Sequence, residues 1–147
     1  MLGDFDVMAT VAVKDVNRAK RFYEDTLGLE QLSMGEEEHV LIYKCGNSKL
    51  LVYPSEFAGT NQATSATWSI DSDVEEVADE LKKRGVKFEH YNFPDAEVKG
   101  DIHYVGGIKG VWFKDPDGNI MHVNSPANVG RSGAGRSVRE KAGSVFK

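Results

Sequence analysis

Short runs in which apolar and polar residues alternate flank two stretches whose apolar residues recur with a helical period. Val7–Val13 is rich in valine and alanine, which favours a strand. Asp15 is expected to cap a helix that continues to about Leu27, where Gly28 ends it. Three further short strands are expected at Leu29–Met34, His39–Lys44 and Lys49–Tyr53. Gly46-Asn47 is expected to form the turn between the last two.

The same order of elements returns in the second half of the chain. Pro54–Thr64 contains Pro, Gly, Asn and Ser without periodicity, so it is expected to be a linker. A strand is predicted over Ala66–Asp71. Asp73 and Glu76 form a capping-box-like pair that begins a helix, which Gly85 ends. The remaining predicted strands, the first two separated by a long loop, are Val86–Tyr91, Tyr104–Phe113 and Ile120–Val123.

This repetition indicates an internal duplication. Asp15 precedes Gly28 by 13 residues, and Asp73 precedes Gly85 by 12. Each half therefore reads as a strand, a helix and three strands. Because one such half cannot close a core by itself, the two sheets are expected to join.

The clearest local signal is the stretch from Asp115 to Gly118. Pro116 fits the second position of a type I turn, and the Asp115 carboxylate can accept a backbone N–H inside the turn. Gly118 occupies a position where a positive φ is common. The segment therefore predicts a tight turn between two strands, with a structural role.

These patterns resemble the vicinal oxygen chelate superfamily, which includes glyoxalase I, bleomycin-resistance proteins and extradiol dioxygenases. The resemblance implies an α+β fold in which two βαβββ modules form a curved eight-stranded mixed sheet around a pocket, often in a homodimer. It covers one domain at residues 1–125, with modules at about 5–54 and 64–125. The motifs that carry it are Val11-x-Val13-x-Asp15, Ala19-x-x-Phe22-Tyr23, Leu27-Gly28 and Phe113-x-Asp115-Pro116-Asp117-Gly118-Asn119.

The resemblance also implies four metal-ligand positions, which fall at Met8, about Val52, about Ser65 and His122. Only His122 suits a hard or borderline divalent metal, whereas catalytic zinc and non-haem iron sites use at least three good protein ligands. The protein is therefore expected to hold no metal cofactor. A divalent metal held by atypical ligands stays open, and His103 beside His122 is conceivable if their strands pair.

Strand alternation independently predicts one face of small polar residues. Such a face, with hydroxyls and one imidazole, suits a neutral or weakly polar organic molecule. Trp68 and Trp112 are expected in the core instead, and His122 could equally be a wall residue that only fills space. Together with the positions from the resemblance, the expected ligand-binding residues are Met8, Thr10, Val52, Ser65, Thr67, His122 and Asn124.

Charge and composition limit the classes of partner that the protein is expected to bind. The 147-residue chain has a net charge of −5, of which residues 126–147 contribute +4 and residues 1–125 contribute −9. The acidic body argues against a nucleic-acid partner, and residues 126–147 are expected to form a flexible basic tail. No apolar run is long enough for a membrane span, and no secretory signal is recognised. With Cys45 as the only cysteine, a cytoplasmic protein is expected.

The sequence leaves two main functional hypotheses and one weaker one open, and no catalytic residue is assigned. The first is a metal-free small-molecule binder with a sequestration or resistance-type role. The second is an enzyme of the same superfamily: a metal-dependent lyase, isomerase or dioxygenase with atypical ligands, or a metal-free enzyme that uses His122 as general base. A dimeric scaffold with a vestigial pocket is a third, weaker reading.

Overall fold

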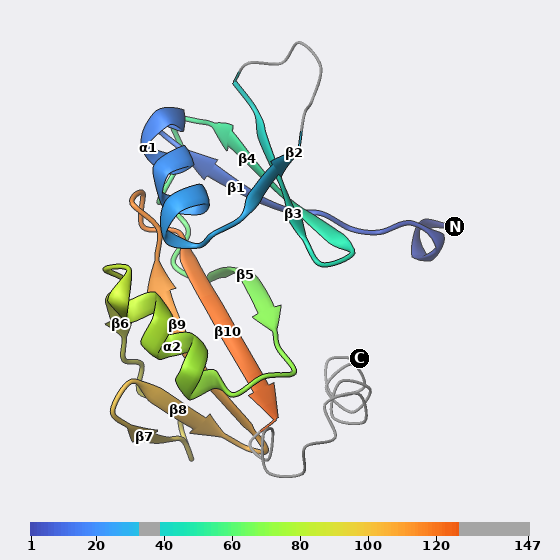
Figure 1. Cartoon of the computed structure of the whole chain (residues 1–147). Helices are drawn as coiled ribbons and strands as arrows, with labels where there is room; N and C mark the ends of the chain where they lie inside the picture. The colour runs from blue at the N-terminus through green and yellow to red at the C-terminus, as the bar shows by residue number, and fades with distance from the viewer. Residues whose placement is uncertain (33–38, 127–147) are drawn as a thin grey trace. The chain divides into compact units, whose positions relative to one another are not determined.

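A computed structural model of the chain describes residues 1–32 and 39–126 (Figure 1). It divides into two compact units, each treated by itself below. Unit 1 comprises Met1–Ala66 and Lys114–Ile120, and unit 2 comprises Thr67–Phe113 and the described residues from Met121 on. The predicted basic tail lies outside the described residues except for Pro126. The predicted domain span of 1–125 stays a prediction.

Unit 1 is built on a four-stranded mixed sheet with the order β1-β4-β3-β2. β1 and β4 run parallel, and the other neighbours are antiparallel. Val11, Val13 and Val52 are buried in the core of this unit. The four strands are β1 (Ala9–Val13), β2 (Glu30–Leu32), β3 (Leu41–Cys45) and β4 (Ser48–Pro54).

The first helix begins and ends where the sequence predicts, but its hydrogen bonding changes halfway. Asp15 caps α1 (Val16–Lys20), since its carboxylate accepts the backbone N–H groups of the second and third helical residues. Arg21–Thr26 continues with the wider π-type hydrogen bonds. Gly28 then ends the helix with a φ of 72°. A short 3₁₀ turn at Leu2–Asp4 precedes β1.

The predicted turn at Asp115–Gly118 belongs to unit 1 and is organised by the buried carboxylate of Asp115. Oδ1 of Asp115 accepts the backbone N–H groups of Asp117 at 2.9 Å and Asn119 at 2.8 Å. Oδ2 accepts from the hydroxyl of Tyr23 at 2.7 Å and from Nδ2 of Asn119 at 2.8 Å. Gly118 has a φ of 90°, as the turn requires. One carboxylate therefore receives four hydrogen bonds.

Two further contacts hold this turn within unit 1. Nδ2 of Asn119 also donates to the backbone carbonyl of Ala12 at 2.8 Å. Asp117 accepts from Nη2 of Arg18 at 2.9 Å, and its side chain is almost fully buried. Its Oδ1 also receives the backbone N–H of Lys14 at 3.2 Å. The turn is therefore bonded to both β1 and α1.

The second sheet has six strands, with the order β5-β10-β9-β8-β7 and with β6 paired to β9. The strands are β5 (Thr64–Ser69), β6 (Phe88–Glu89), β7 (Glu97–Lys99), β8 (Ile102–Val105), β9 (Ile108–Lys114) and β10 (Ile120–Pro126). The prediction of one strand over Tyr104–Phe113 was wrong. The chain turns back at Gly106-Gly107, where Gly106 has a φ of 60°. β7 was not predicted, because all three of its residues are exposed and leave no hydrophobic alternation to detect.

Helix α2 (Val74–Lys83) covers one face of this sheet (Figure 1). Its buried residues are Val74, Ala78 and Leu81. Asp73 caps it by accepting the N–H of Glu75 at 3.3 Å, so the observed cap bond does not involve Glu76.

An ion-pair cluster joins β9 to the N-terminus of α2. The side chain of Lys109 is 8% exposed, and its Nζ donates to Asp73 at 3.0 Å and to Glu75 at 2.8 Å. Alternation along β9 puts Val111 and Phe113 on this helix-covered face, and both are buried. Gly110 and Trp112 therefore lie on the opposite face.

The α+β class is thus confirmed, with two mixed sheets of four and six strands. The single curved eight-stranded sheet is not confirmed. No helix within residues 1–32 and 39–126 is long and apolar enough to cross a membrane.

The Tyr23–Asp115 hydrogen bond makes the first testable prediction. Tyr23→Phe removes one donor from a buried carboxylate while retaining the ring, so we expect the free energy of unfolding to fall by about 2 kcal/mol. Urea denaturation measures this value. The matched control is Tyr53→Phe, at an exposed tyrosine of β4, which should change it by less than about 0.5 kcal/mol. Equal effects in the two variants would contradict the role given to Asp115.

Candidate functional site

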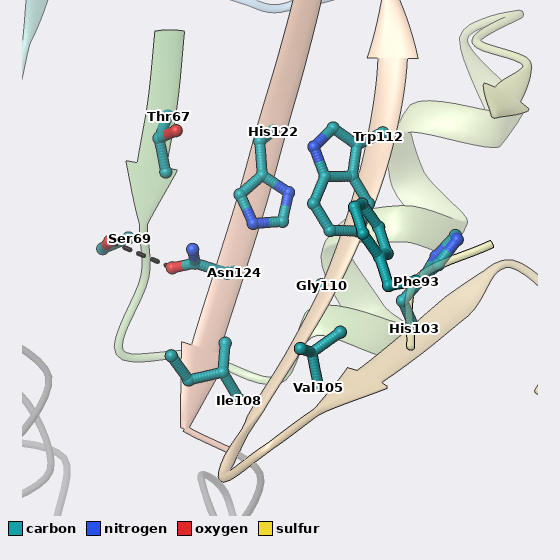
Figure 2. Close-up of a pocket in the computed structure, with 10 residues that line it drawn as sticks. All are labelled: Thr67, Ser69, Phe93, His103, Val105, Ile108, Gly110, Trp112, His122 and Asn124. Carbon is teal, nitrogen blue, oxygen red and sulfur yellow. Dashed lines mark hydrogen bonds between the residues drawn. The ribbon is translucent and has the colours of Figure 1, made fainter. Parts of the chain in front are cut away.

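A cavity of about 510 Å³ opens on the face of the second sheet that α2 does not cover (Figure 2). All of its lining residues belong to unit 2. The polar lining comes from Thr67, Ser69, His122 and Asn124, and the apolar lining from Phe93, Val105, Ile108 and Trp112; Gly110 and His103 complete it.

Strand alternation explains which side chains reach the cavity. Thr67 and Ser69 are two residues apart on β5, and His122 and Asn124 are two residues apart on β10. Each pair therefore points to one side of the sheet. Met121 and Val123, at the intervening positions of β10, are buried on the opposite side.

The imidazole of His122 is held in one tautomer. Its Nδ1 lies 2.9 Å from the backbone carbonyl of Val111, which can only accept, so Nδ1 carries the proton. Burial lowers the pKa of His122, and the neighbouring His103 acts in the same direction. The ring is therefore neutral near pH 7. Its Nε2 is an acceptor with no hydrogen-bond partner among the described residues.

Aromatic rings form the wall beside His122. Trp112 stacks on the imidazole with a centroid distance of 3.9 Å and an interplanar angle of 17°. Phe93 lies 5.2 Å from the Trp112 ring, measured between centroids. His103 meets Trp112 edge to face at 4.9 Å. Trp112 thus separates the two histidines and gives the cavity an aromatic side.

His103 is fully buried and neutral. Its Nε2 accepts the backbone N–H of Tyr91 at 2.9 Å, which leaves the proton on Nδ1. Nδ1 has no hydrogen-bond partner among the residues that the structure describes. Burial lowers the pKa of His103. β8, which carries His103, pairs with β9 and β7 and not with β10, so the suggested pairing of its strand with that of His122 is not found.

A second polar pair lies on the other side of His122. The Ser69 hydroxyl donates to Oδ1 of Asn124 at 3.0 Å, as the dashed line in Figure 2 shows. This bond orients the Asn124 amide, whose Nδ2 makes no hydrogen bond within the described part of the chain. Asn124 is therefore a free donor in the lining of the cavity.

Gly110 leaves the space that the imidazole occupies. A Cβ at Gly110 would lie 2.5 Å from Cε1 of His122, 3.0 Å from the carbonyl oxygen of Val123 and 3.2 Å from Cβ of Asn124. Any larger residue would displace the ring of His122.

Three of the seven predicted ligand-binding residues come together in this cavity: Thr67, His122 and Asn124. The other four belong to unit 1. Met8 and Ser65 are half-buried, and Thr10 is exposed. Val52 is fully buried and pairs with Val11, so it faces the core, and Leu51 is the residue opposite Thr10. Val52 is thus not accessible to a ligand on the face of Thr10.

The sequence reasoning missed the aromatic wall. Trp112 was assigned to the core, yet it is half-buried and lines the cavity. Side chains alternate along a strand, so the burial expected for Val111 and Phe113 on one face could have placed Trp112 on the other face, where the cavity lies. Phe93 and His103 carried no comparable signal, because the strands around them were not correctly predicted.

The residues around His122 do not fit a metal site. Among the described residues, no three His, Cys, Asp or Glu side chains come together to hold a metal ion. The partners beside His122 are an amide, a hydroxyl and an indole, which are poor ligands for zinc or iron compared with imidazole, thiolate and carboxylate.

Comparison with known proteins decides the family. Residues 7–123 match the family described as the Glyoxalase/Bleomycin resistance protein/Dioxygenase superfamily. The chain belongs to this superfamily. The family predicted from the sequence motifs is therefore confirmed.

The relatives with similar sequences or structures are distant in sequence. Virulence protein STM3117 of Salmonella typhimurium is 22% identical over 124 residues, which cover 78% of each chain. The lactoylglutathione lyase of Agrobacterium tumefaciens is similar in structure, with a TM-score of 0.59 and 20% identity, over 82% of this chain and 92% of that one. TnmS3, an antibiotic binding protein from Streptomyces sp. CB03234, has a TM-score of 0.55 and 25% identity, over 81% and 93%.

Two glycines near the β8–β9 turn provide a matched test of the cavity. Gly110→Ala should lower the free energy of unfolding by about 1–3 kcal/mol, because the new Cβ overlaps the imidazole. It should also move the ring-current-shifted NMR signals of His122. Gly107→Ala is the control, since a methyl group there would have no heavy atom within 4 Å and the φ of Gly107 is not positive. An unchanged His122 spectrum in Gly110→Ala would contradict the described packing.

The neutral histidines predict a dependence of stability on pH. The pKa values of His122 and His103 are lowered by folding, so below about pH 6.5 the unfolded chain binds more protons than the folded one. The free energy of unfolding should therefore decrease as the pH falls through this range. Urea denaturation at about pH 7.5 and about pH 5.5 measures the slope. His122→Phe should make it shallower, and an unaltered slope would exclude His122 as a contributor.

Proposed function

We propose that this superfamily member binds a small uncharged organic molecule in the unit 2 cavity and serves a sequestration or resistance-type role without a metal. The observation that carries the proposal is a cavity of about 510 Å³ in which aromatic rings stand beside two unpaired polar groups, Nε2 of His122 and Nδ2 of Asn124. Pockets for small molecules combine an apolar lining with a few oriented polar groups in this way.

The charge of the lining supports an uncharged ligand. None of the lining residues is Asp, Glu, Lys or Arg, and both histidines are neutral near pH 7. Transfer of a charged group into such a site is unfavourable without a partner of opposite charge. A ligand gains affinity here from burial of its apolar surface and from one or two hydrogen bonds.

The partner of His122 favours binding over general base catalysis. A catalytic histidine is often oriented by a carboxylate that stabilises the protonated ring. Here the Nδ1 partner is the carbonyl of Val111, and burial lowers the pKa of the imidazole. The antibiotic binding protein TnmS3, which shares the fold, supports a binding role in addition.

The finer sequence predictions remain part of this proposal. Thr67, His122 and Asn124 are the proposed ligand contacts. We also propose that the protein is a cytoplasmic homodimer, and sedimentation equilibrium of the purified chain tests the dimer. The metal-dependent lyase, isomerase or dioxygenase is the alternative that the experiments below decide.

Ligand binding can be followed through Trp112. The chain has two tryptophans, so Trp68→Phe leaves Trp112 as the only one. In this background we expect 2-naphthol, an uncharged bicyclic compound, to change the Trp112 emission in a saturable way. His122→Ala should weaken binding by about 1 kcal/mol, or about fivefold, which is the net contribution of one hydrogen bond. His39→Ala, at an exposed histidine in unit 1, is the control and should leave the affinity unchanged.

Elemental analysis separates the binder from the metal-dependent enzyme. We expect less than about 0.1 equivalent of zinc, iron, nickel or manganese per chain, because affinity for such metals needs several converging ligands. About one equivalent per chain, lost in His122→Ala, would overturn the metal-free proposal.

A further inference from the structure

The hydrogen-bonding state of the cavity restricts the ligand more narrowly than its shape does. His122 and Asn124 each use one polar atom inside the protein and leave one unpaired. Which atom is left decides whether the ligand must donate or accept at that position. The inference rests on the proposed function, since it concerns the ligand of the same cavity.

At His122 the ligand must donate. The Val111 carbonyl holds the proton on Nδ1, so Nε2 presents a lone pair. In Figure 2 the second ring nitrogen of His122 points to the side of the cavity on which Asn124 lies. A hydroxyl or N–H group pairs with it, whereas an ether or carbonyl oxygen there would leave two acceptors facing one another.

At Asn124 the ligand must accept. Oδ1 of Asn124 receives the Ser69 hydroxyl at 3.0 Å, so the free amide group is the donor Nδ2. The residue is almost fully buried, at 2% exposure, which raises the cost of leaving this donor unpaired. A carbonyl oxygen is a suitable partner.

His122 and Asn124 lie close enough along β10 for one ligand to contact both. His122 and Asn124 are two positions apart on one strand, so their Cα atoms are separated by roughly 7 Å. One aromatic molecule that carries both a hydroxyl and a carbonyl can therefore contact both side chains. Aromatic rings also match the wall formed by Trp112 and Phe93.

We propose that the cavity selects uncharged hydroxyaryl carbonyl compounds, in which an aryl hydroxyl donates to Nε2 of His122 and a carbonyl oxygen accepts from Nδ2 of Asn124. The ligand therefore has to donate at His122 and accept at Asn124. The required donor distinguishes such a compound from its methyl ether, which has the same rings and carbonyl and lacks only the hydroxyl hydrogen.

Three compounds test it in the Trp68→Phe background: 6-acetyl-2-naphthol, its methyl ether, and 2-naphthol, which lacks the carbonyl. We expect acetylnaphthol to bind about fivefold more tightly than either of the others. In His122→Phe, which retains an aromatic ring at position 122, acetylnaphthol and its ether should bind with equal affinity. In Asn124→Ala, acetylnaphthol should lose its advantage over 2-naphthol. His39→Phe, at an exposed histidine of unit 1 that does not line the cavity, is the control, and it should preserve both preferences.

The outcomes separate this inference from the proposed function. If all three compounds bind the single-tryptophan protein equally well, the assigned directions are wrong while the binding function stands. If the ether is still disfavoured in His122→Phe, its rejection is steric and the role of Nε2 is overturned. If none of the compounds binds, the proposed function and the inference both fail. If His122→Phe does not fold, the comparison of acetylnaphthol with 2-naphthol in Asn124→Ala still tests the carbonyl contact, because it requires no variant at position 122.

Discussion

The four hydrogen bonds received by the Asp115 carboxylate are the constraint on which the described site depends. They fix the turn between β9 and β10, in which the N–H of Asp115 donates to the carbonyl of Asn119 at 2.9 Å. Counting outward from this pair along two antiparallel strands brings Trp112 opposite His122. The same count brings Gly110 opposite Asn124. One short turn thus sets which side chains of the two strands meet in the cavity.

The site is assembled from neutral groups whose polarity is set by their neighbours. The Val111 carbonyl determines the tautomer of His122, and the Ser69 hydroxyl determines the orientation of the Asn124 amide. Neither neighbour needs to touch the ligand. In a site without formal charge, such contacts decide which atoms remain for recognition.

Local sequence signals predicted the elements that depend on short-range chemistry. The Asp15 and Asp73 caps, the stop at Gly28 and the Asp115 turn were all recognisable, because each requires a particular residue at a particular position. Alternation placed Thr67, His122 and Asn124 on one face, and all three line the cavity, because the side-chain period of a strand is independent of its partners.

The features that could not be predicted depend on contacts between distant segments. β7 has no buried residue, so only its pairing with β8 reveals it. The Trp112 side chain is largely apolar, and it lines a cavity because α2 covers the opposite face of its strand. Phe93 reaches the lining from a loop that has no periodicity. The family resemblance implied four metal-ligand positions, but it could not predict that only His122 among them lines the cavity.

The buried Lys109 has a consequence for how the chain tolerates insertions and deletions. A slip of β9 by one residue would turn Lys109 toward the aromatic cavity and leave Ile108 or Gly110 beside Asp73 and Glu75. Both changes are unfavourable. The first places the Lys109 ammonium group among aromatic rings, and the second leaves the carboxylates of Asp73 and Glu75 without their cation. Lys109 therefore helps to fix the register of β9, because it makes the shifted register less favourable than an aliphatic residue at that position would. Substitution of cavity side chains on β9 is therefore expected to leave the alignment of this strand unchanged.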